Sequence, residues 1–305
     1  MGRVSSQTGG IGRRLNKNLY MKKFGYIRLG MIFPLFVCLC VLSACNRKDD
    51  GVVKILAIGN SFSENAMETH LYDIAKACGK EVVLGNLYIG GCSLERHRDN
   101  VNNDTPAYSY RKIFSDGSRV VRDSVTVAEA IPDEDWDYIT FQQVSQKAGK
   151  YETFFPYLEE LKSYVDERVT NKDVQYAMHM TWAYESGATH FGFPAYSCDQ
   201  NIMFDSIVSA VNRAARVAGI EIVIPAGTAV QNARNSAIGD HLCIDGYHLN
   251  SKGKYVASCA WVETLLGCST VGCGYIPEDI PAEEVAILQH AAHRAVMCPM
   301  QVLSE

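Results

Sequence analysis

The sequence lacks any excess of basic residues. It carries 29 lysines and arginines against 34 aspartates and glutamates, which gives a net charge of −5 at pH 7. Proteins that bind nucleic acid depend on clustered positive charge to meet the phosphate backbone. The charge balance therefore argues against nucleic acid as a partner and leaves every other class of substrate open.

Metal-binding patterns are also scarce. The sequence has 11 cysteines but no C-x-x-C pair, which argues against a zinc ribbon. His241, Asp245 and His248 offer possible ligands, but they lack the H-x-x-x-H spacing that places two histidines on one helix face. We expect neither a metal nor an organic cofactor.

The N-terminal apolar run, residues 29–41, is too short to span a bilayer comfortably. It follows a basic segment that starts at Met21, and it ends in Leu-Ser-Ala before Cys45, as in a bacterial lipoprotein signal. We expect residues 1–45 to be a signal peptide and lipobox, with translation starting at Met21, and residues 46–51 to be a tether. Lipid on Cys45 would anchor the exported protein to a membrane, which would be the outer membrane in a bacterium that has two. The alternative is an uncleaved signal anchor. Export permits disulfides, and Cys268 and Cys273 are the nearest candidates for a local pair.

Strand and helix patterns alternate from residue 52 onward. Apolar runs predict strands at 52–58, 81–89, 137–141, 174–180 and 221–224. Helical periodicity occupies 64–78, 154–169, 201–218, 251–266 and 285–297. A polar insertion at about 92–130 interrupts the alternation of strands and helices and contains a predicted hairpin. The pattern predicts an α/β fold for residues 52–305, a three-layer sandwich with a mostly parallel five-stranded sheet.

Ligands of such sheets bind beyond the carboxyl ends of the strands, so the segments that follow the strands matter most. The first strand runs into Gly59-Asn60-Ser61-Phe62-Ser63. Ser61 would stand exposed near a helix N-terminus, where the helix dipole stabilises negative charge. Ser61 is a candidate nucleophile and Ser63 a candidate helix cap, although both hydroxyls are also typical of a plain turn.

Three later segments offer matching chemistry. Gly91 ends a glycine pair after the second strand, where bare backbone N–H groups can face a ligand. Gln142 and Gln143 follow the third strand and can donate amide N–H groups to an oxyanion. Asp245 and His248 stand three apart just before a helix, and a carboxylate so close to an imidazole can prepare it as a general base.

Together these segments resemble the SGNH, or GDSL-type, hydrolase superfamily over roughly residues 54–266. Gly59-Asn60-Ser61 stands where that family has Gly-Asp-Ser, Gly91 where it has its oxyanion glycine, and Asp245-Gly-Tyr-His248 where it has Asp-x-x-His. The strings "IGNSFS", "GGCSLERH", "TFQQVS", "MTWAY" and "DGYHLN" look like an uncharacterised exported branch of the superfamily. Asn60 departs from the family acid, and the third block lacks Gly-x-Asn-Asp.

The resemblance implies a serine esterase in which Ser61 attacks, His248 is the base and Asp245 orients it. The oxyanion donors would be the backbone N–H groups of Ser61 and Gly91 with the side chain of Gln143, or of Gln142. His179, Trp182 and Tyr184 follow the fourth strand and are candidates for lining the substrate site, or simply core residues.

The resemblance and the predicted lipid anchor favour O-acetyl esters of a carbohydrate as substrate. A small-molecule ester or an acylated polysaccharide would then be the only partner besides the membrane that holds the lipid. A short-chain lipase or thioesterase is the alternative within the same chemistry. A glycan-binding lipoprotein without catalysis is the alternative outside it, because a fold does not fix a function.

Overall fold

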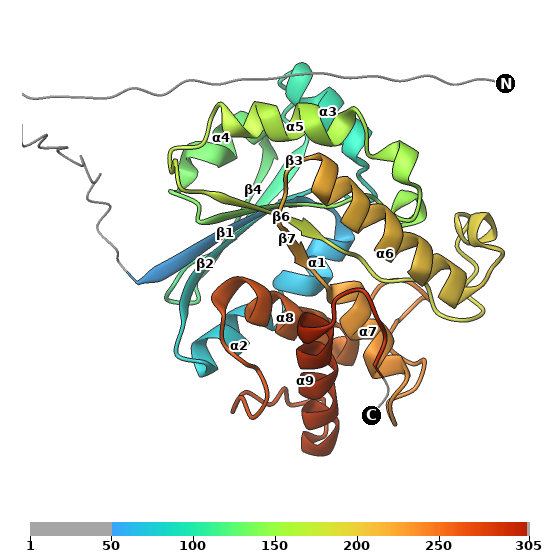
Figure 1. The fold of residues 1–305 in the computed structure, drawn as a ribbon. Helices are drawn as coiled ribbons and strands as arrows, with labels where there is room; N and C mark the ends of the chain where they lie inside the picture. Colours follow the sequence, from blue (N-terminus) through green and yellow to red (C-terminus); the bar gives the residue numbers. More distant parts are fainter. Residues whose placement is uncertain (1–50, 304–305) are drawn as a thin grey trace, which may run out of the picture. The chain divides into compact units, whose positions relative to one another are not determined.

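A seven-stranded sheet forms the centre of residues 51–303, the part of the chain that the computed structural model describes (Figure 1). Its spatial order is β4-β3-β2-β1-β5-β6-β7. The strands are β1 (Val52–Gly59), β2 (Glu81–Tyr88), β3 (Tyr108–Ile113), β4 (Arg119–Val125), β5 (Tyr138–Phe141), β6 (Gln175–His179) and β7 (Ile222–Ile224). The predicted signal peptide, Cys45 and residues 46–50 of the tether lie outside the described residues.

The five predicted strands are all present, and they run parallel as β2-β1-β5-β6-β7. The predicted count of five is nevertheless wrong, because the inserted hairpin joins the sheet. β3 pairs antiparallel with β2, and β4 pairs antiparallel with β3. Pairing between β2 and β3 is a contact between segments that no local pattern reveals, so the sequence showed the hairpin but not its place.

Helices cover both faces of the sheet and give the expected three layers (Figure 1). One face carries α3 (Leu94–Asn102), α4 (Val127–Ala130), α5 (Tyr157–Asp166) and α6 (Gln200–Val217). The other carries α1 (Ser61–Met67), α2 (Leu71–Ala77), α7 (Ala226–Arg234), α8 (Ser251–Leu266) and α9 (Ala282–Met297). Short 3-10 helices lie at Ile131–Asp133, Ser145–Lys147, Tyr151–Thr153 and Phe193–Tyr196.

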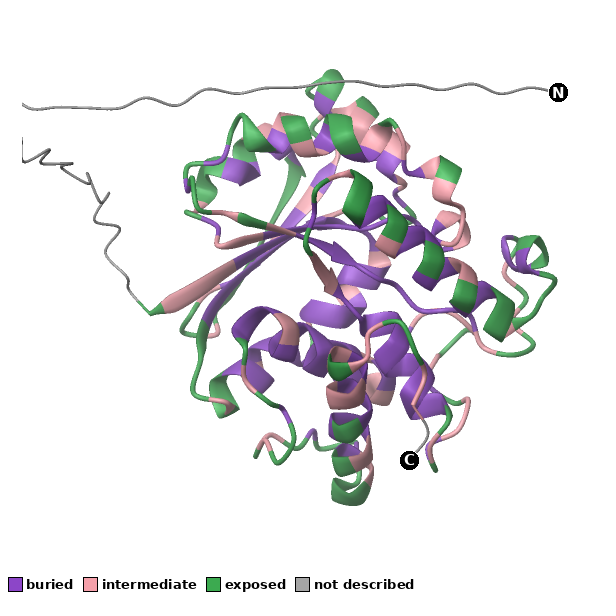
Figure 2. Cartoon of the chain, viewed as in Figure 1, coloured by how far each residue is buried: buried purple, intermediate pink, exposed green. Residues whose placement is uncertain are grey.

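The core lies on the two faces of the sheet, where strands and inner helix faces are buried (Figure 2). α7 and α8 are buried on almost every side, because α9 packs over them on the side away from the sheet. In residues 51–303 no helix combines the length and the apolar character needed to cross a membrane.

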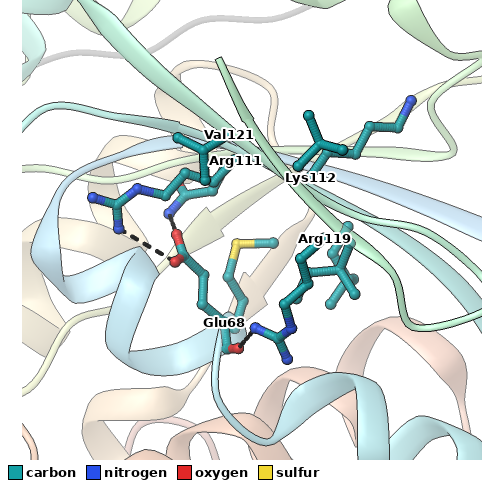
Figure 3. A pocket seen from close by; sticks show the side chains of 10 residues that line it. Glu68, Arg111, Lys112, Arg119 and Val121 are labelled. Atoms are coloured by element: carbon teal, nitrogen blue, oxygen red, sulfur yellow. Dashed lines mark hydrogen bonds and ion pairs between the residues drawn. The ribbon is translucent and has the colours of Figure 1, made fainter. Parts of the chain in front are cut away.

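The predicted helix over 64–78 is two helices, because the chain breaks around Glu68. Arg119 Nη1 donates to the Glu68 carbonyl oxygen at 2.7 Å, and Asn86 Nδ2 donates to Glu68 Oε1 at 2.5 Å. Arg111 also reaches the Glu68 carboxylate, at 3.3 Å (Figure 3). These side chains line a cavity of about 120 Å³ between α1 and the β3–β4 hairpin. Hydrogen bonds from neighbouring strands therefore hold Glu68 at the end of α1, at the point where a single continuous helix would have gone on.

Candidate active site

The carboxyl ends of the parallel strands meet at one edge of the sheet. Gly59 of β1 is in register with Tyr88 of β2, and Ile58 with Phe141 of β5. Phe141 in turn pairs with Met178 of β6. The segments that follow β1, β2, β5 and β6 therefore leave the sheet together, as the sequence predicts.

Ser61 is the first residue of α1, directly after the end of β1. Asn60 is the N-cap, and its Oδ1 accepts the N–H of Phe62 at 3.0 Å. The predicted cap, Ser63, is instead buried, with its Oγ 2.8 Å from the Asn60 carbonyl oxygen and 2.9 Å from Asn86 Oδ1. Gly59 is required at this turn, since a Cβ there would lie 2.4 Å from Ser63 Oγ.

His248 and Asp245 complete a hydrogen-bonded series that starts at the Ser61 hydroxyl. His248 Nε2 lies 2.9 Å from Ser61 Oγ, and His248 Nδ1 lies 2.6 Å from Asp245 Oδ2. The other oxygen, Asp245 Oδ1, accepts the backbone N–H groups of Tyr247 at 3.1 Å and of His248 at 2.8 Å. Such an order of atoms equips the hydroxyl with a base and the base with an orienting carboxylate.

The Asp245 carboxyl is held in its ionised form. Burial alone would raise its pKa, but the hydrogen bonds from the backbone and ring of His248 and the N–H of Tyr247 outweigh burial and lower the pKa below its usual value. A carboxylate that accepts several N–H bonds is expected to behave in this way. Asp245 is therefore an anion at neutral pH, able to stabilise positive charge on His248.

Three contacts fix the histidine loop against the serine helix. Asn65 of α1 accepts the backbone N–H of Leu249 at 2.7 Å through its Oδ1, in a buried position. Phe62, next to Ser61, stacks on Trp182 with ring centroids 4.3 Å apart. Trp182 Nε1 donates to the carbonyl oxygen of Tyr247 at 2.8 Å. The residues beside Ser61 and beside His248 are thus held to one another.

A cavity of about 370 Å³ opens over Ser61 and His248. Gly91 and Gln146 line it from the segments after β2 and β5, and Tyr247 lines it beside His248. The remaining lining residues include His190 and Phe191 of the long β6–α6 connection. Gln146, His190, Phe191 and Tyr247 were not predicted; only Tyr247 had a signal, as the residue inside Asp245-Gly-Tyr-His248.

Backbone N–H groups are available at the predicted oxyanion positions. Within residues 51–303, the N–H groups of Ser61 and Gly91 donate no hydrogen bond to the protein. The first N–H groups of a helix have no partner within it, which explains Ser61. Gly91 has φ +62°, a left-handed conformation that favours glycine and carries Gly91 into the cavity wall.

The structure does not support the predicted oxyanion role of the two glutamines. Gln142 Nε2 donates to Asn60 Oδ1 at 2.6 Å, and Gln142 is buried. Gln143 Nε2 donates to the Thr153 carbonyl oxygen at 2.8 Å, while its Oε1 accepts the N–H groups of Leu94 and Val144. Both amides are used inside the protein, so they hold the third block in place rather than face a substrate.

His179, Trp182 and Tyr184 do not line the cavity either. Their exposed fractions are 1%, 0% and 0%, so the core interpretation of these residues is correct. His179 Nδ1 lies 2.8 Å from Gln142 Oε1, and Tyr184 Oη lies 2.8 Å from Ser145 Oγ. These side chains therefore belong to the core beneath the site.

Cys268 and Cys273, the predicted local pair, carry free thiols, so this disulfide is absent from the structure. In the described part of the chain, no group of three or more His, Cys, Asp or Glu side chains could hold a metal ion. Of the possible metal ligands, His248 and Asp245 are instead bonded to each other, and His248 to Ser61.

Fold and site together define a three-layer α/β protein with a hydrogen-bonded Ser–His–Asp set at the carboxyl edge of its sheet. Residues 54–295 match the family model described as "Domain of unknown function (DUF4886)", and the chain belongs to that family. The crystal structure of a DUF4886 family protein from Bacteroides uniformis ATCC 8492 is 45% identical in sequence. That match covers 83% of this chain and 98% of the other, with a TM-score of 0.82.

More distant solved structures include hydrolases. A putative SGNH hydrolase from Slackia heliotrinireducens is 22% identical in sequence. That match covers 70% of this chain and 99% of the other, with a TM-score of 0.49. A mutant of Axe2, an acetyl-xylooligosaccharide esterase from Geobacillus stearothermophilus, is 11% identical in sequence. That match covers 70% of this chain and 93% of the other, with a TM-score of 0.47. No curated protein matches the chain.

Proposed function

We propose that this protein is a serine esterase of the SGNH type that removes O-acetyl groups from a carbohydrate. The observation that carries the proposal is the series Ser61 Oγ, His248 Nε2, His248 Nδ1 and Asp245 Oδ2, joined at 2.9 Å and 2.6 Å. A protein that only binds glycans would have no use for a hydroxyl, a base and an ionised carboxylate in this order.

In the proposed reaction, His248 Nε2 takes the hydroxyl proton as Ser61 Oγ attacks the ester carbonyl carbon. The carbonyl π electrons move to its oxygen, and the imidazolium is stabilised by Asp245. When the tetrahedral intermediate collapses, His248 returns the proton to the leaving sugar oxygen and an acetyl-Ser61 ester remains. Water, activated by the same histidine, then releases acetate and restores the serine.

The oxyanion would be held by the N–H groups of Ser61 and Gly91 and by the side-chain amide of Gln146. Gln146 lines the cavity, and its Oε1 accepts a hydrogen bond from Ser145 Oγ at 3.3 Å. Its Nε2 makes no hydrogen bond within residues 51–303, which leaves that donor for a substrate. Donors set in advance around a developing charge supply a large share of such catalysis.

Cavity size supports a short acyl group. About 370 Å³ lies at the lower end of the range for small-molecule sites, and part of it must receive the alcohol side of the ester. We further propose that the chain is exported and carries lipid on Cys45, which would present the site to extracellular or periplasmic glycans.

The deciding experiment compares wild type with Ser61→Ala for acetate release from a panel of acetylated glycans and for p-nitrophenyl acetate hydrolysis. We expect the variant to lose about a thousandfold or more in kcat on both, because the nucleophile is gone. Ser163→Ala, a serine on α5 outside the cavity, is the matched control and should retain wild-type rates.

Three results would contradict the proposal. Ser61→Ala with wild-type rates would show that another group does the chemistry. A folded wild-type protein that neither hydrolyses these esters nor reacts at Ser61 with a fluorophosphonate would favour a glycan-binding protein. Hydrolysis of p-nitrophenyl palmitate but not of the acetate would instead indicate a lipase.

A further inference from the structure

Four aromatic rings follow one another along one side of the cavity. The His248 ring lies 4.3 Å from that of Tyr247, centroid to centroid, and Tyr247 lies 4.7 Å from His190 in a T-shaped contact. His190 stacks on Phe191 at 4.5 Å. The series leads from His248, the proposed general base, to the exposed ring of Phe191, and all four residues line the cavity.

His190 is held as a neutral hydrogen-bond donor. Its Nδ1 accepts the backbone N–H of Gly192 at 3.0 Å, so the proton of the neutral ring must sit on Nε2. Burial lowers the pKa of His190 and the nearby His248 lowers it further, which together outweigh the opposite effect of Asp245. The Nε2–H makes no hydrogen bond within residues 51–303, although His190 lines the cavity.

Phe191 is the most exposed large apolar residue of the described chain, with 79% of its surface accessible. The loop that carries it is nevertheless packed against the histidine loop. Glu185 N–H donates to the Gly246 carbonyl oxygen at 2.8 Å, and a Cβ on Gly246 would lie 2.9 Å from that of Ala188. A single exposed apolar residue is ordinary on a protein surface, but Phe191 also lines the cavity from a loop fixed in this way, so its ring can contact a bound ligand.

We propose that Phe191 and His190 bind the sugar ring that carries the ester, which rests on the esterase function proposed above. Phe191 would stack on the apolar C–H face of a pyranose, and the His190 Nε2–H would donate to a hydroxyl or ring oxygen of the same sugar. A hydrocarbon chain could cover Phe191 but would leave the His190 donor unpaired, which costs binding energy. The pairing of an apolar ring with a fixed donor therefore selects a carbohydrate.

The test measures kcat/KM on an acetylated xylo- or manno-oligosaccharide and on p-nitrophenyl acetate for each variant. The ratio that decides is kcat/KM on the oligosaccharide divided by kcat/KM on p-nitrophenyl acetate. We expect this ratio to fall about tenfold in Phe191→Ala, chiefly through a higher KM for the oligosaccharide. Phe191→Trp should keep the ratio, because an indole offers the same kind of stacking face. Ile276→Ala, another exposed apolar residue, 52% accessible and outside the cavity, is the matched control.

His190→Phe keeps an aromatic ring and removes the donor, so the ratio should again fall about tenfold. Unchanged ratios in both Phe191→Ala and His190→Phe would overturn the inference and leave the esterase intact. A larger loss on p-nitrophenyl octanoate than on the oligosaccharide would overturn it as well, by assigning the rings to an acyl chain. A wild type that hydrolyses neither ester, with Ser61 inert to fluorophosphonate, would remove the proposed function and this inference with it.

Discussion

Asn60 sets the geometry of the serine turn through three side-chain hydrogen bonds. Its Oδ1 accepts the N–H groups of Phe62 and Gln142, and its Nδ2 donates to the Cys92 carbonyl oxygen at 3.0 Å. Because the Gln142 Nε2 is bonded to Asn60, its Oε1 faces His179 Nδ1, which must therefore carry the proton of that ring. The orientations of both amides and the tautomer of His179 are thus fixed together. An aspartate could not donate to the Cys92 carbonyl oxygen, which gives a reason for an asparagine where the Gly-Asp-Ser pattern that this segment resembles has an acid.

Gln146→Ala tests the third oxyanion donor. We expect kcat to fall by about tenfold to a hundredfold with KM little changed, because the lost hydrogen bond forms in the transition state. Steady-state kinetics on p-nitrophenyl acetate measure the change. Gln175→Ala is the matched control, since Gln175 is exposed at the opposite end of β6. An unaltered kcat in Gln146→Ala would leave only the two backbone donors.

At the scale of elements, the loop before α8 carries His248, the proposed base, and Glu185 holds this loop in place. Glu185 Oε1 accepts the backbone N–H groups of Leu242 at 2.9 Å and of Cys243 at 2.7 Å. The same loop is held by a second contact, because the buried Arg234 pairs with Asp240 at 2.9 Å. These charges do not line the cavity, so Glu185 is a positioning residue for the Asp245–His248 loop.

Glu185→Ala should therefore reduce kcat by about tenfold or more and slow fluorophosphonate labelling of Ser61, because two loop N–H groups lose their acceptor. Glu185→Gln replaces the accepting carboxylate oxygen with an amide oxygen and should recover most of the rate. Melting temperatures of both variants, measured alongside, separate a displaced loop from general unfolding. Equal activity in Glu185→Ala and wild type would show that the loop holds its place without this contact.

Elements with a clear local signal were predictable. α8 begins and ends where the sequence predicts, because Asn250 caps its first turn by accepting the N–H of Gly253, and Gly267 ends the helix with φ +63°. α7 was missed because all of its residues from Ala226 to Arg234 are buried, so it has no polar face to reveal a period. α3 was missed for the opposite reason, a sequence that is mostly polar.

The proposed catalytic residues could be predicted from the sequence, while their surroundings could not. Ser61, Asp245 and His248 stand in short strings whose chemistry can be read without a fold, and the structure places them within hydrogen-bond distance. The predicted oxyanion donor, Gln143 or Gln142, is wrong because both amides already have partners inside the protein, which is a tertiary property. The predicted wall of Trp182 and Tyr184 failed because burial, too, is decided by packing.

At the scale of the whole molecule, two buried histidines make stability depend on pH. Burial lowers the pKa of both His97 and His179 to about 3, from 6.5. Below pH 6.5 the unfolded chain binds protons that the folded chain does not, so the free energy of unfolding falls as pH drops toward about 3. Each histidine contributes up to about 1.4 kcal/mol per pH unit in that window.

Denaturant unfolding between about pH 7 and 5 checks this dependence, in a range above the titration of most carboxylates. We expect wild type to lose stability steadily, and His97→Gln to show a shallower slope whatever its stability at neutral pH. His290→Gln, an exposed histidine on α9, should keep the wild-type slope. A slope that His97→Gln does not reduce would mean that His97 takes up a proton in the folded state.

The hydrogen bond between Ser61 and His248 joins residues 187 positions apart. A ribosome would therefore have synthesised Ser61, its helix and all seven strands of the sheet before it reaches His248, the proposed base. Nascent chains and fragments that stop short of Asp245 would carry the hydroxyl without the means to ionise it. If the proposed function is correct, ester cleavage could begin only after His248 has been synthesised, so a cell making this protein would be protected from the activity until then.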